Sequence, residues 1–201
     1  MCIRDSQYSE NGLLLDLEPY LGSVIETDPL PENILSIGVV DDTTYGIATS
    51  TNAWGVFTNP TLLETAGVEE FAGGDWEDYD DWMDEVTEAG AGEFWGGSDW
   101  TGRIQNFELQ LRSEGKNLFD EDGTPGFDED RLKEFWESGD DIRDGVVVPQ
   151  QVVEELNPLT AFDAAKNASE MTWDNFGAGY LANLGESYTE LGLVAPVSYT
   201  H

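Results

Sequence analysis

Cysteine and histidine are almost absent from the sequence. The only cysteine is Cys2 and the only histidine is His201, so each lies at an end of the chain. With Cys2 set aside as a terminal residue, cysteine nucleophiles, disulfides and thiolate zinc sites are excluded. With His201 set aside in the same way, Ser-His-Asp catalysis, imidazole metal sites and the commonest general base are excluded as well. No glycine-rich phosphate loop or dinucleotide motif is present, so we predict no catalytic residue and no cofactor.

The two chain ends are related through the genetic code. VSYTH at 197–201 can be written GTC TCT TAT ACA CAT, and the reverse complement of that DNA encodes MCIRD, with which the chain begins. We interpret residues 1–6 and 197–201 as a scar from sequencing-library preparation and set them aside. The native sequence is then expected to run from Gln7 to Pro196, without the true N-terminus and the true C-terminus of the protein.

Basic residues are scarce too. The chain has 8 Lys and Arg against 42 Asp and Glu, which gives a formal net charge of −34. This charge excludes nucleic acid and anionic membranes as partners. The acids are spread along the whole chain, which is typical of an acidic surface adapted to high salt, where ions screen the self-repulsion. A halophilic source of this kind predicts a fold that loosens in low salt and tightens in molar salt.

The sequence also lacks an apolar run long enough to span a membrane. It nevertheless has 201 residues with 7 Trp, 7 Tyr and 9 Phe, which favours a folded core over disorder despite the charge. Helices are predicted over 31–40, 60–67, 75–86, 101–114, 127–145 and 157–166, and extended strands over 45–50, 52–59, 169–173 and 188–196. Their alternation predicts an α/β sheet.

The tryptophans fall into two groups. Trp76, Trp82 and Trp136 lie on apolar helix stripes and are expected in the core. The others lie at strand ends or in loops beside amide and charged side chains; these are Trp54, Trp95, Trp100 and Trp173, with Asn52, Asp99, Arg103, Asp174 and Asn175. A flat ring next to polar groups suits a sugar, because the ring covers the C–H face of the pyranose and the polar groups bind its hydroxyls. The alternative is that these tryptophans are ordinary core residues.

Two short motifs hold most of this second group. GGSDW (96–100) and MTWDNFG (171–177) each place Trp beside Asp after a predicted strand, where ligands bind in open α/β sheets. A third motif, DEDGTPGFDE (120–129), nearly matches a calcium loop, but the first ligand position would be Leu118. We therefore interpret it as an Asp-Gly turn and predict no metal site.

Four segments in order carry a resemblance to a known family. YGIATSTNAWGVFTNPTLLETAGV (45–68), DWEDYDDW (75–82), FELQLRSEGKNLFDEDGTPGFDEDRLKEFWESGDDIRDGVVVP (107–149) and FDAAKNASEMTWDNFG (162–177) resemble the sugar-type extracellular solute-binding proteins of ABC transporters, of which the maltose-binding protein is a familiar member. The resemblance covers nearly all of 7–196 and rests on the order and spacing of weak motifs. Ala48 and Ala165 replace a proline and a glycine that are usual in the family.

The resemblance implies an α/β, periplasmic-binding-protein-like (type II) fold with two lobes that close by a hinge. The chain would be an incomplete copy, with residues 7–52 as the end of the first lobe, 53–58 as the hinge crossing and 59–196 as most of the second lobe. Carried over residue by residue, the family pattern places Asn52 at a polar hinge position, Asp99 and Trp100 in a ligand loop, and 173–176 at the stacking tryptophan. The predicted ligand-binding residues are Asn52, Trp95, Asp99, Trp100, Trp173, Asp174 and Asn175.

The function that the resemblance implies is capture of a sugar, without catalysis, and its delivery to an ABC transporter permease. The protein is expected to be a monomer, extracellular or periplasmic, and anchored to the membrane through an N-terminal signal that the chain lacks. A secreted glycoside hydrolase or its carbohydrate-binding module would share the same aromatic and acidic residues. A structural surface protein of a salt-loving cell is a third possibility.

Overall fold

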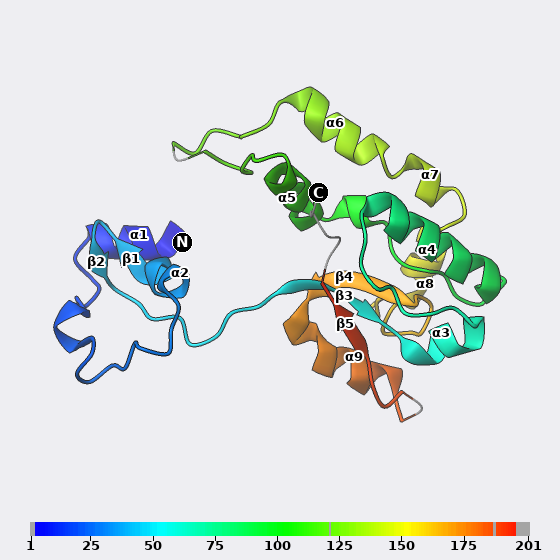
Figure 1. Ribbon diagram of the computed structural model, residues 1–201, viewed down its shortest axis with the longest axis horizontal. Helices are drawn as coiled ribbons and strands as arrows, with labels where there is room; N and C mark the ends of the chain where they lie inside the picture. The colour runs from blue at the N-terminus through cyan, green and yellow to red at the C-terminus, as the bar shows by residue number, and fades with distance from the viewer. Residues whose placement is uncertain (1–2, 121, 187, 196–201) are drawn as a thin grey trace. The chain divides into compact units, whose positions relative to one another are not determined.

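The computed structural model of the chain describes residues 3–120, 122–186 and 188–195. The chain divides into two compact units, Met1–Thr51 and Asn52–His201 (Figure 1). Cys2, His201 and the rest of the predicted scar at 197–201 lie outside the described residues, whereas residues 3–6 belong to the first helix.

The first unit consists of short elements. They are α1 (Ile3–Glu10), η1 (Glu18–Tyr20), α2 (Glu32–Leu35), η2 (Ser36–Gly38), β1 (Val39–Val40) and β2 (Thr43–Thr44). The helix predicted over 31–40 is therefore two single turns followed by a strand, and the strand predicted over 45–50 is not formed. Among the described residues of this unit only Thr44 is buried, while Leu13 and Val24 are 69% and 77% exposed, so the unit has little core of its own.

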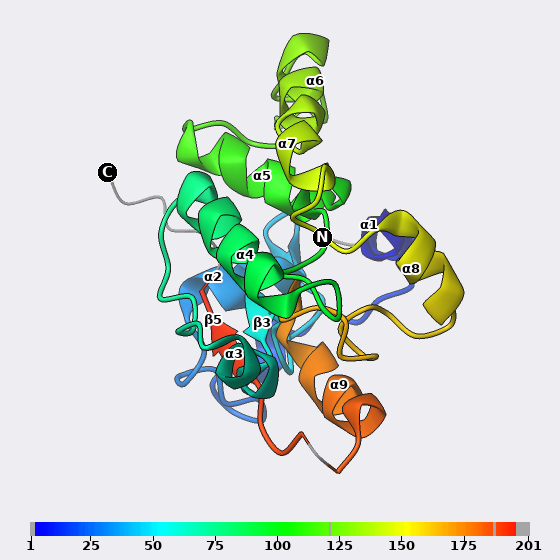
Figure 2. The ribbon, with the colours of Figure 1, turned by 90° about the vertical axis from the view of Figure 1, so that its right-hand side faces the viewer.

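The second unit holds most of the regular structure. Its elements are β3 (Trp54–Thr58), α3 (Pro60–Ala66), α4 (Trp76–Gly90), η3 (Trp100–Gly102), α5 (Ile104–Ser113), α6 (Glu129–Glu137), α7 (Asp140–Arg143), α8 (Gln150–Leu156), β4 (Ser169–Trp173), η4 (Asp174–Phe176), α9 (Gly177–Leu184) and β5 (Gly192–Val194). The chain is thus a mixed helix and sheet protein, as predicted. Figure 2 shows α4 and α9 on opposite sides of the sheet.

The sheet of the second unit has the strand order β4-β3-β5, with β3 antiparallel to both neighbours. The register pairs Trp54 with Trp173 at one end and Thr58 with Ser169 at the other. The carboxyl end of β4 therefore lies beside the amino end of β3, rather than beside another carboxyl end as in a parallel sheet. Successive residues of β3 point to opposite faces of the sheet and pack on different helices. Val56 packs in the core cluster that includes residues of α4 and α5, and Phe57 packs with Tyr180 of α9.

Local cap chemistry explains where several helices begin. The side chain of Asn59 accepts a hydrogen bond from the amide of Leu62 at the start of α3. Asp75 and Asp78 form a reciprocal capping box on α4, and Asp128 accepts the amide of Arg131 in α6. These helix starts confirm the predictions made from proline and aspartate positions.

Two predicted helices differ from the structure. Residues 157–166 form turns, because Asn157 precedes a proline and adopts an extended ψ of 127°, which ends α8 at Leu156. The long helix predicted over 127–145 is interrupted after Glu137 and continues as the short α7. In both cases the turn residues overrode the apolar periodicity.

Trp136 is not a core residue, so its assignment to a buried stripe was wrong. Its side chain is 53% exposed, whereas the neighbouring Phe135 is 1% exposed and packs in the core cluster. Residues adjacent in a helix point in directions about 100° apart, so only one of the two can face the core. Trp76 and Trp82 do pack against the core, as predicted.

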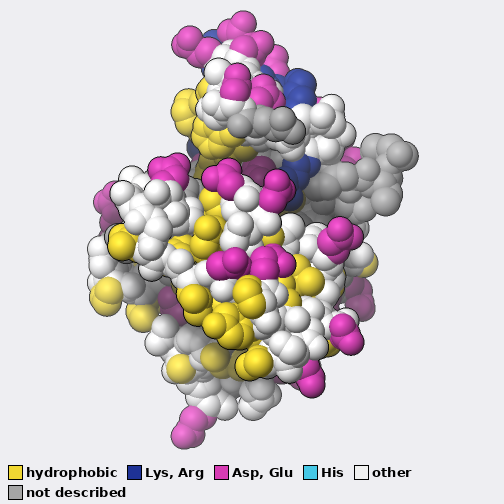
Figure 3. Space-filling model, turned by 90° about the vertical axis from the view of Figure 1, so that its left-hand side faces the viewer, with side chains coloured by type: hydrophobic (Ala, Val, Ile, Leu, Met, Phe, Trp, Pro, Cys, Tyr) yellow, Lys and Arg dark blue, Asp and Glu magenta, His cyan; other side chains and the backbone are white. Residues whose placement is uncertain are grey.

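Acidic side chains far outnumber basic side chains in this protein. On the face in Figure 3, Asp and Glu side chains are interspersed with exposed hydrophobic side chains, and some of the acidic side chains lie next to one another. The described cations in ion pairs are Arg103, Arg112, Lys116, Arg131, Lys133 and Arg143. With 42 acids in the chain, most carboxylates have no cation to pair with.

Candidate functional site

Two tryptophans meet where β3 begins and β4 ends. The rings of Trp54 and Trp173 lie edge to face, with centroids 5.1 Å apart and an interplanar angle of 81°. Trp173 is 37% exposed, and Trp54 is partly buried against the core. The edge-to-face contact fixes the orientation of the Trp173 ring while leaving part of it open to solvent.

A buried asparagine anchors this pair to α5. The indole Nε1 of Trp54 donates to Oδ1 of Asn106 at 2.8 Å. Asn106 is fully buried, and its Nδ2 donates to the carbonyl oxygen of Trp100 at 2.9 Å. Since Asn106 lies in the first turn of α5, one side chain joins β3, η3 and the start of α5.

Arg103 lies at the N-cap of α5 and reaches β4. Its Nη2 is 3.1 Å from Oε1 of Glu170, and the Arg103 side chain is 50% exposed. Glu170 itself is 4% exposed, and its other oxygen accepts a hydrogen bond from Oγ of Ser98 at 2.6 Å. The pair thus has a buried, hydrogen-bonded carboxylate on one side and a half-exposed guanidinium on the other.

Asp174 closes the same end of the sheet. Its backbone amide donates to the carbonyl oxygen of Ala53 at 2.9 Å, which holds the start of η4 against the residue before β3. Its Oδ1 is buried and has no hydrogen-bond partner among the described residues. Asn52 and Asn175 are both exposed. We call Trp54, Asn106, Trp173 and Asp174 the tryptophan platform; Arg103 and Glu170 lie apart from it, because Glu170 is in register with Phe57, on the opposite face of the sheet from Trp54 and Trp173.

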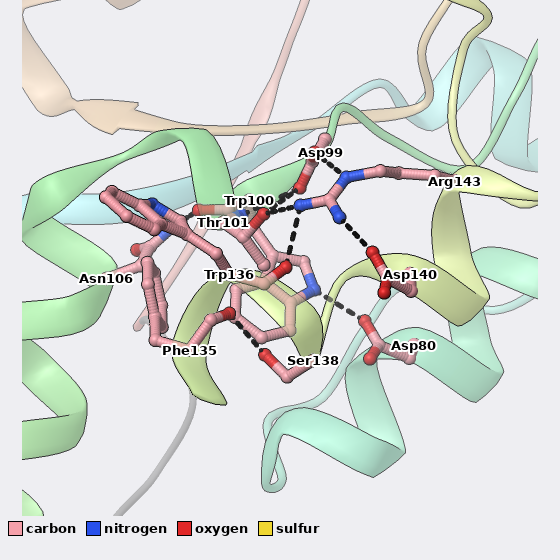
Figure 4. Close-up of polar contacts among 10 residues, drawn as sticks. All are labelled: Asp80, Asp99, Trp100, Thr101, Asn106, Phe135, Trp136, Ser138, Asp140 and Arg143. Atoms are coloured by element: carbon pink, nitrogen blue, oxygen red, sulfur yellow. Dashed lines mark hydrogen bonds and ion pairs between the residues drawn. The ribbon is translucent and has the colours of Figure 1, made fainter. Parts of the chain in front are cut away.

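Asp99 and Trp100 belong to a different network, drawn in Figure 4. Trp100 is 3% exposed, its ring packs 4.3 Å from that of Trp76, and its Nε1 donates to Oδ1 of Asp80 at 2.6 Å. Asp99 caps η3 and forms an ion pair with Arg143 at 2.7 Å. Trp100 is therefore a buried core residue, whereas Asp99, whose side chain is 32% exposed, ties the loop to Arg143.

Burial also changes the acidity of this network. It raises the pKa of Asp80 from its ordinary value of 3.8 to about 6, and the nearby charges of Asp81 and Asp99 act in the same direction. The hydrogen bond from Trp100 acts in the opposite direction but is the weaker effect. The hydrogen bond with Asp99 raises the pKa of Arg143. The charge of Asp80 is therefore costly in the folded protein.

Trp95 lies at the edge of the sheet. Its backbone forms an isolated parallel bridge with Asn167, in which the Trp95 amide donates to Lys166 and its carbonyl oxygen accepts from Ala168. The two glycines after it allow close packing on α4: a Cβ on Gly96 would lie 2.2 Å from the carbonyl oxygen of Met83. The motif GGSDW is thus explained by packing.

The predicted ligand-binding residues therefore separate into three places. Asn52, Trp173, Asp174 and Asn175 come together at the platform end of the sheet. Asp99 and Trp100 lie in the network that includes Asp80 and Arg143, and Trp95 lies at the β4 edge. Sequence reasoning did not find Asn106 or the pairing of Arg103 with Glu170, although the scarcity of basic residues singles out any arginine beside a tryptophan loop.

The second unit also has two hollows away from the tryptophan platform. A hollow of about 460 Å³ lies beside Trp76, Asp80 and Trp100, and one of about 500 Å³ lies beside Lys116, Phe127 and Arg131. Neither hollow contains Trp173. Across the described residues, no cluster of three or more His, Cys, Asp or Glu is arranged to hold a metal ion. In the 120–129 segment, Asp122 accepts the backbone amide of Thr124, as in a simple turn.

The fold and the motifs agree with a known protein family. The family model described as bacterial extracellular solute-binding protein matches residues 4–189 of the chain. The chain belongs to this family. Its structure has the type II periplasmic-binding-protein-like fold, as the sequence predicted, and the part present corresponds to about half of the solved relatives.

Solved structures of solute-binding proteins show how far the likeness extends. An extracellular solute-binding protein of family 1 from Alicyclobacillus acidocaldarius is 24% identical with a TM-score of 0.75, over 96% of this chain and 48% of that one. An ABC substrate-binding protein from Listeria monocytogenes in complex with cycloalternan is 21% identical with a TM-score of 0.74, over 98% and 51%. A Streptomyces glaucescens receptor solved with acarbose is 18% identical with a TM-score of 0.68, over 96% and 49%.

This solute-binding chain spans about half the length of the solved relatives it matches. In the part that the structure describes, no helix combines the length and the apolar character needed to cross a bilayer. At these identities the likeness to each structure establishes the fold, so the ligand has to be argued from the platform itself.

Proposed function

We propose that this protein is an extracellular receptor that binds a carbohydrate and delivers it to an ABC transporter permease. The single observation that carries the proposal is the ring of Trp173, part-exposed and braced edge to face by Trp54. Family membership supports the transport role, and the relatives solved with cycloalternan and acarbose support a sugar as the ligand.

The platform offers each of the groups that a sugar requires. The Trp173 ring provides an apolar surface for the C–H face of a pyranose, and a ring that is already oriented loses little entropy on binding. Asp174, which is half-buried, adds a carboxylate directly after Trp173 in the chain. The exposed amides of Asn52 and Asn175 can donate and accept hydrogen bonds.

We further propose that the protein captures its ligand without turnover. A glycoside hydrolase would need two carboxyl groups flanking the scissile bond. Asp174 follows Trp173 directly in the chain, and the other carboxylate of this strand, Glu170, is buried in its pair with Arg103. We also propose that the protein works as a monomer at the outer face of the membrane, held there by an N-terminal signal, and that its acidic surface is an adaptation to high salt.

The proposal is tested by titration calorimetry of the full-length gene product in molar NaCl with cycloalternan, acarbose and maltotriose. We expect saturable binding of at least one sugar with a stoichiometry of one. Trp173→Ala should weaken that binding by about tenfold, because the stacking and apolar contact of one ring are together worth about 1–2 kcal/mol.

Phe119→Ala is the matched control, because Phe119 is a more exposed aromatic, at 58%, in a turn distant in sequence from β3 and β4. The affinity of the Phe119→Ala variant for the sugar should equal that of the wild type. Equal affinity of Trp173→Ala and wild type would show that the ligand binds elsewhere. Absence of binding to every sugar would contradict the receptor hypothesis, and steady release of reducing ends from an oligosaccharide would favour the hydrolase.

A further inference from the structure

Asn106 is a polar side chain in a place where packing alone would favour an apolar one. It is fully buried in the first turn of α5, and two residues that follow it on this helix, Phe107 and Leu111, belong to the apolar core cluster. Burying an amide costs free energy unless its groups are hydrogen-bonded, so an apolar side chain would be the simpler choice for stability. An asparagine here therefore indicates a role beyond packing.

Both halves of the Asn106 amide have a partner, which leaves the side chain one orientation. Its Oδ1 accepts Nε1 of Trp54 at 2.8 Å, and its Nδ2 donates to the carbonyl oxygen of Trp100 at 2.9 Å. That carbonyl group is fixed, because Trp100 is buried and its own Nε1 donates to Asp80. If the amide were turned over, Oδ1 would face another acceptor and Nδ2 another donor. The oxygen of Asn106 is thus held towards Trp54.

This oxygen in turn fixes the ring of Trp54. Trp54 is the first residue of β3, and its backbone is held in register opposite Trp173 of β4. With the backbone fixed, only the side-chain torsions remain free, and a hydrogen bond at the indole N–H selects among their combinations. Asn106 lies 52 positions away in the chain and belongs to α5, so it holds the ring from outside the sheet.

Trp173 depends on Trp54 for the orientation of its own ring. The two rings meet edge to face at 5.1 Å and 81°, and Trp54 is the one aromatic ring in contact with Trp173 among the described residues. Trp173 is 37% exposed, so the protein packs on only part of its side chain. A change at Asn106 should therefore reach the exposed part of Trp173 through Trp54.

We propose that Asn106 is a positioning residue, which orients Trp54 and through it holds the ring of Trp173 ready for the ligand. The inference rests on the proposed function of the platform and adds the residue that prepares the platform for binding. A ring that is already oriented loses less conformational entropy when the ligand binds. Without Asn106 the ligand would have to order the ring itself, which should weaken binding about three- to tenfold.

The first test measures sugar affinity and ring orientation in the full-length gene product. Calorimetry in molar NaCl with cycloalternan, acarbose and maltotriose gives the affinity. Fluorine NMR of protein labelled with fluorotryptophan reports the ring of Trp173, whose signal is assigned by its loss in Trp173→Phe. Asn106→Leu removes both hydrogen bonds, so it should weaken binding about three- to tenfold and move this signal towards that of a free indole. Val86→Ala is the control, because Val86 is fully buried in a different core cluster, and it should change neither readout.

Asn106→Asp is a sharper variant, because a proton can restore the missing donor. An ionised aspartate accepts from Trp54 but turns its second oxygen towards the carbonyl oxygen of Trp100, whereas a protonated one donates to that carbonyl group. Relative to the wild type at the same pH, Asn106→Asp should bind about tenfold more weakly at about pH 9 and within about twofold at about pH 5. The comparison at each pH removes the contribution of Asp80, whose pKa of about 6 lies in this range.

Trp54→Phe shows whether Asn106 acts through Trp54. This variant keeps an aromatic ring and removes the N–H that Asn106 accepts. Adding Asn106→Leu to Trp54→Phe should then weaken binding no further, because both substitutions break the same link. Losses of affinity that multiply in the double variant would overturn the proposal.

Three other results would also overturn it. They are a wild-type affinity in Asn106→Leu, an unchanged Trp173 signal in that variant, and a relative affinity of Asn106→Asp that does not depend on pH. If Asn106→Leu does not fold, Asn106→Asp decides alone. Absence of sugar binding in the wild type would refute the proposed function, whereas the fluorine signal would still show whether Asn106 orients Trp173.

Discussion

Replacing Asp80 by asparagine should stabilise the protein at neutral and alkaline pH. Asp80 accepts the indole N–H of Trp100 at 2.6 Å, and an asparagine oxygen can accept the same hydrogen bond. What the substitution removes is a charge in a partly buried place, beside the charges of Asp81 and Asp99. Asp80→Asn therefore keeps the hydrogen bond with Trp100 and removes the electrostatic cost of the partly buried charge.

The magnitude follows from the pKa of Asp80, which burial raises from 3.8 to about 6. One pKa unit corresponds to about 1.4 kcal/mol, so the full difference is about 3 kcal/mol. Because part of the Asp80 side chain is open to solvent, we reduce this to about 1–2 kcal/mol. A carboxyl whose pKa is raised in the folded state contributes stability below its unfolded pKa and loses it as the pH rises through the folded value. The gain of Asp80→Asn should therefore develop between about pH 4 and about pH 6.

Chemical unfolding in molar salt at about pH 4 and about pH 8 measures this gain. Asp84→Asn is the control, because Asp84 is an exposed acid on the same helix and its substitution removes the same overall charge. We expect a free energy of unfolding at about pH 8 that is higher for Asp80→Asn than for Asp84→Asn, and little difference at about pH 4. A gain of equal size at both pH values, or a loss at about pH 8, would refute the reasoning.

Three further predictions concern stability. Asp75→Ala should lower the free energy of unfolding by about 1 kcal/mol, because it removes the capping box of α4, whereas Asp75→Ser should recover most of the loss in the same denaturant titration. Phe135→Ala should cost about 3–5 kcal/mol in that assay, because Phe135 is 1% exposed, and a cost below about 1 kcal/mol would contradict its place in the core. The thermal midpoint should rise between about 0.2 M and about 2 M NaCl, since salt screens a net charge of −34; a falling midpoint would count against a halophilic origin.

Elements with local causes could be predicted from the sequence. The starts of α3, α4 and α6 follow from Asn59-Pro60, Asp75 and Asp128, because a cap depends on residues three positions apart. The strands β3 and β4 follow from runs of aromatic and β-branched residues. The order of weak motifs then indicated the type II fold.

The site could be predicted only in part, because its contacts join distant parts of the chain. Arg103 and Glu170 are 67 residues apart and Trp54 and Asn106 are 52 apart, so no local pattern links them. Whether a tryptophan in a loop is covered also depends on tertiary packing. Trp100 and Trp173 stand in similar Trp-Asp motifs, yet one is 3% exposed and the other 37%. Burial on folding decides between two residues that look alike in sequence.

The most direct test of the account is a crystal structure of the full-length gene product with an oligosaccharide bound. We expect the ring of Trp173 to lie against a pyranose, with Asp174 or Asn175 within hydrogen-bond distance of its hydroxyl groups. A sugar bound away from Trp173, for example in the hollow beside Trp76 and Trp100, would contradict the central claim that the tryptophan platform is the ligand site.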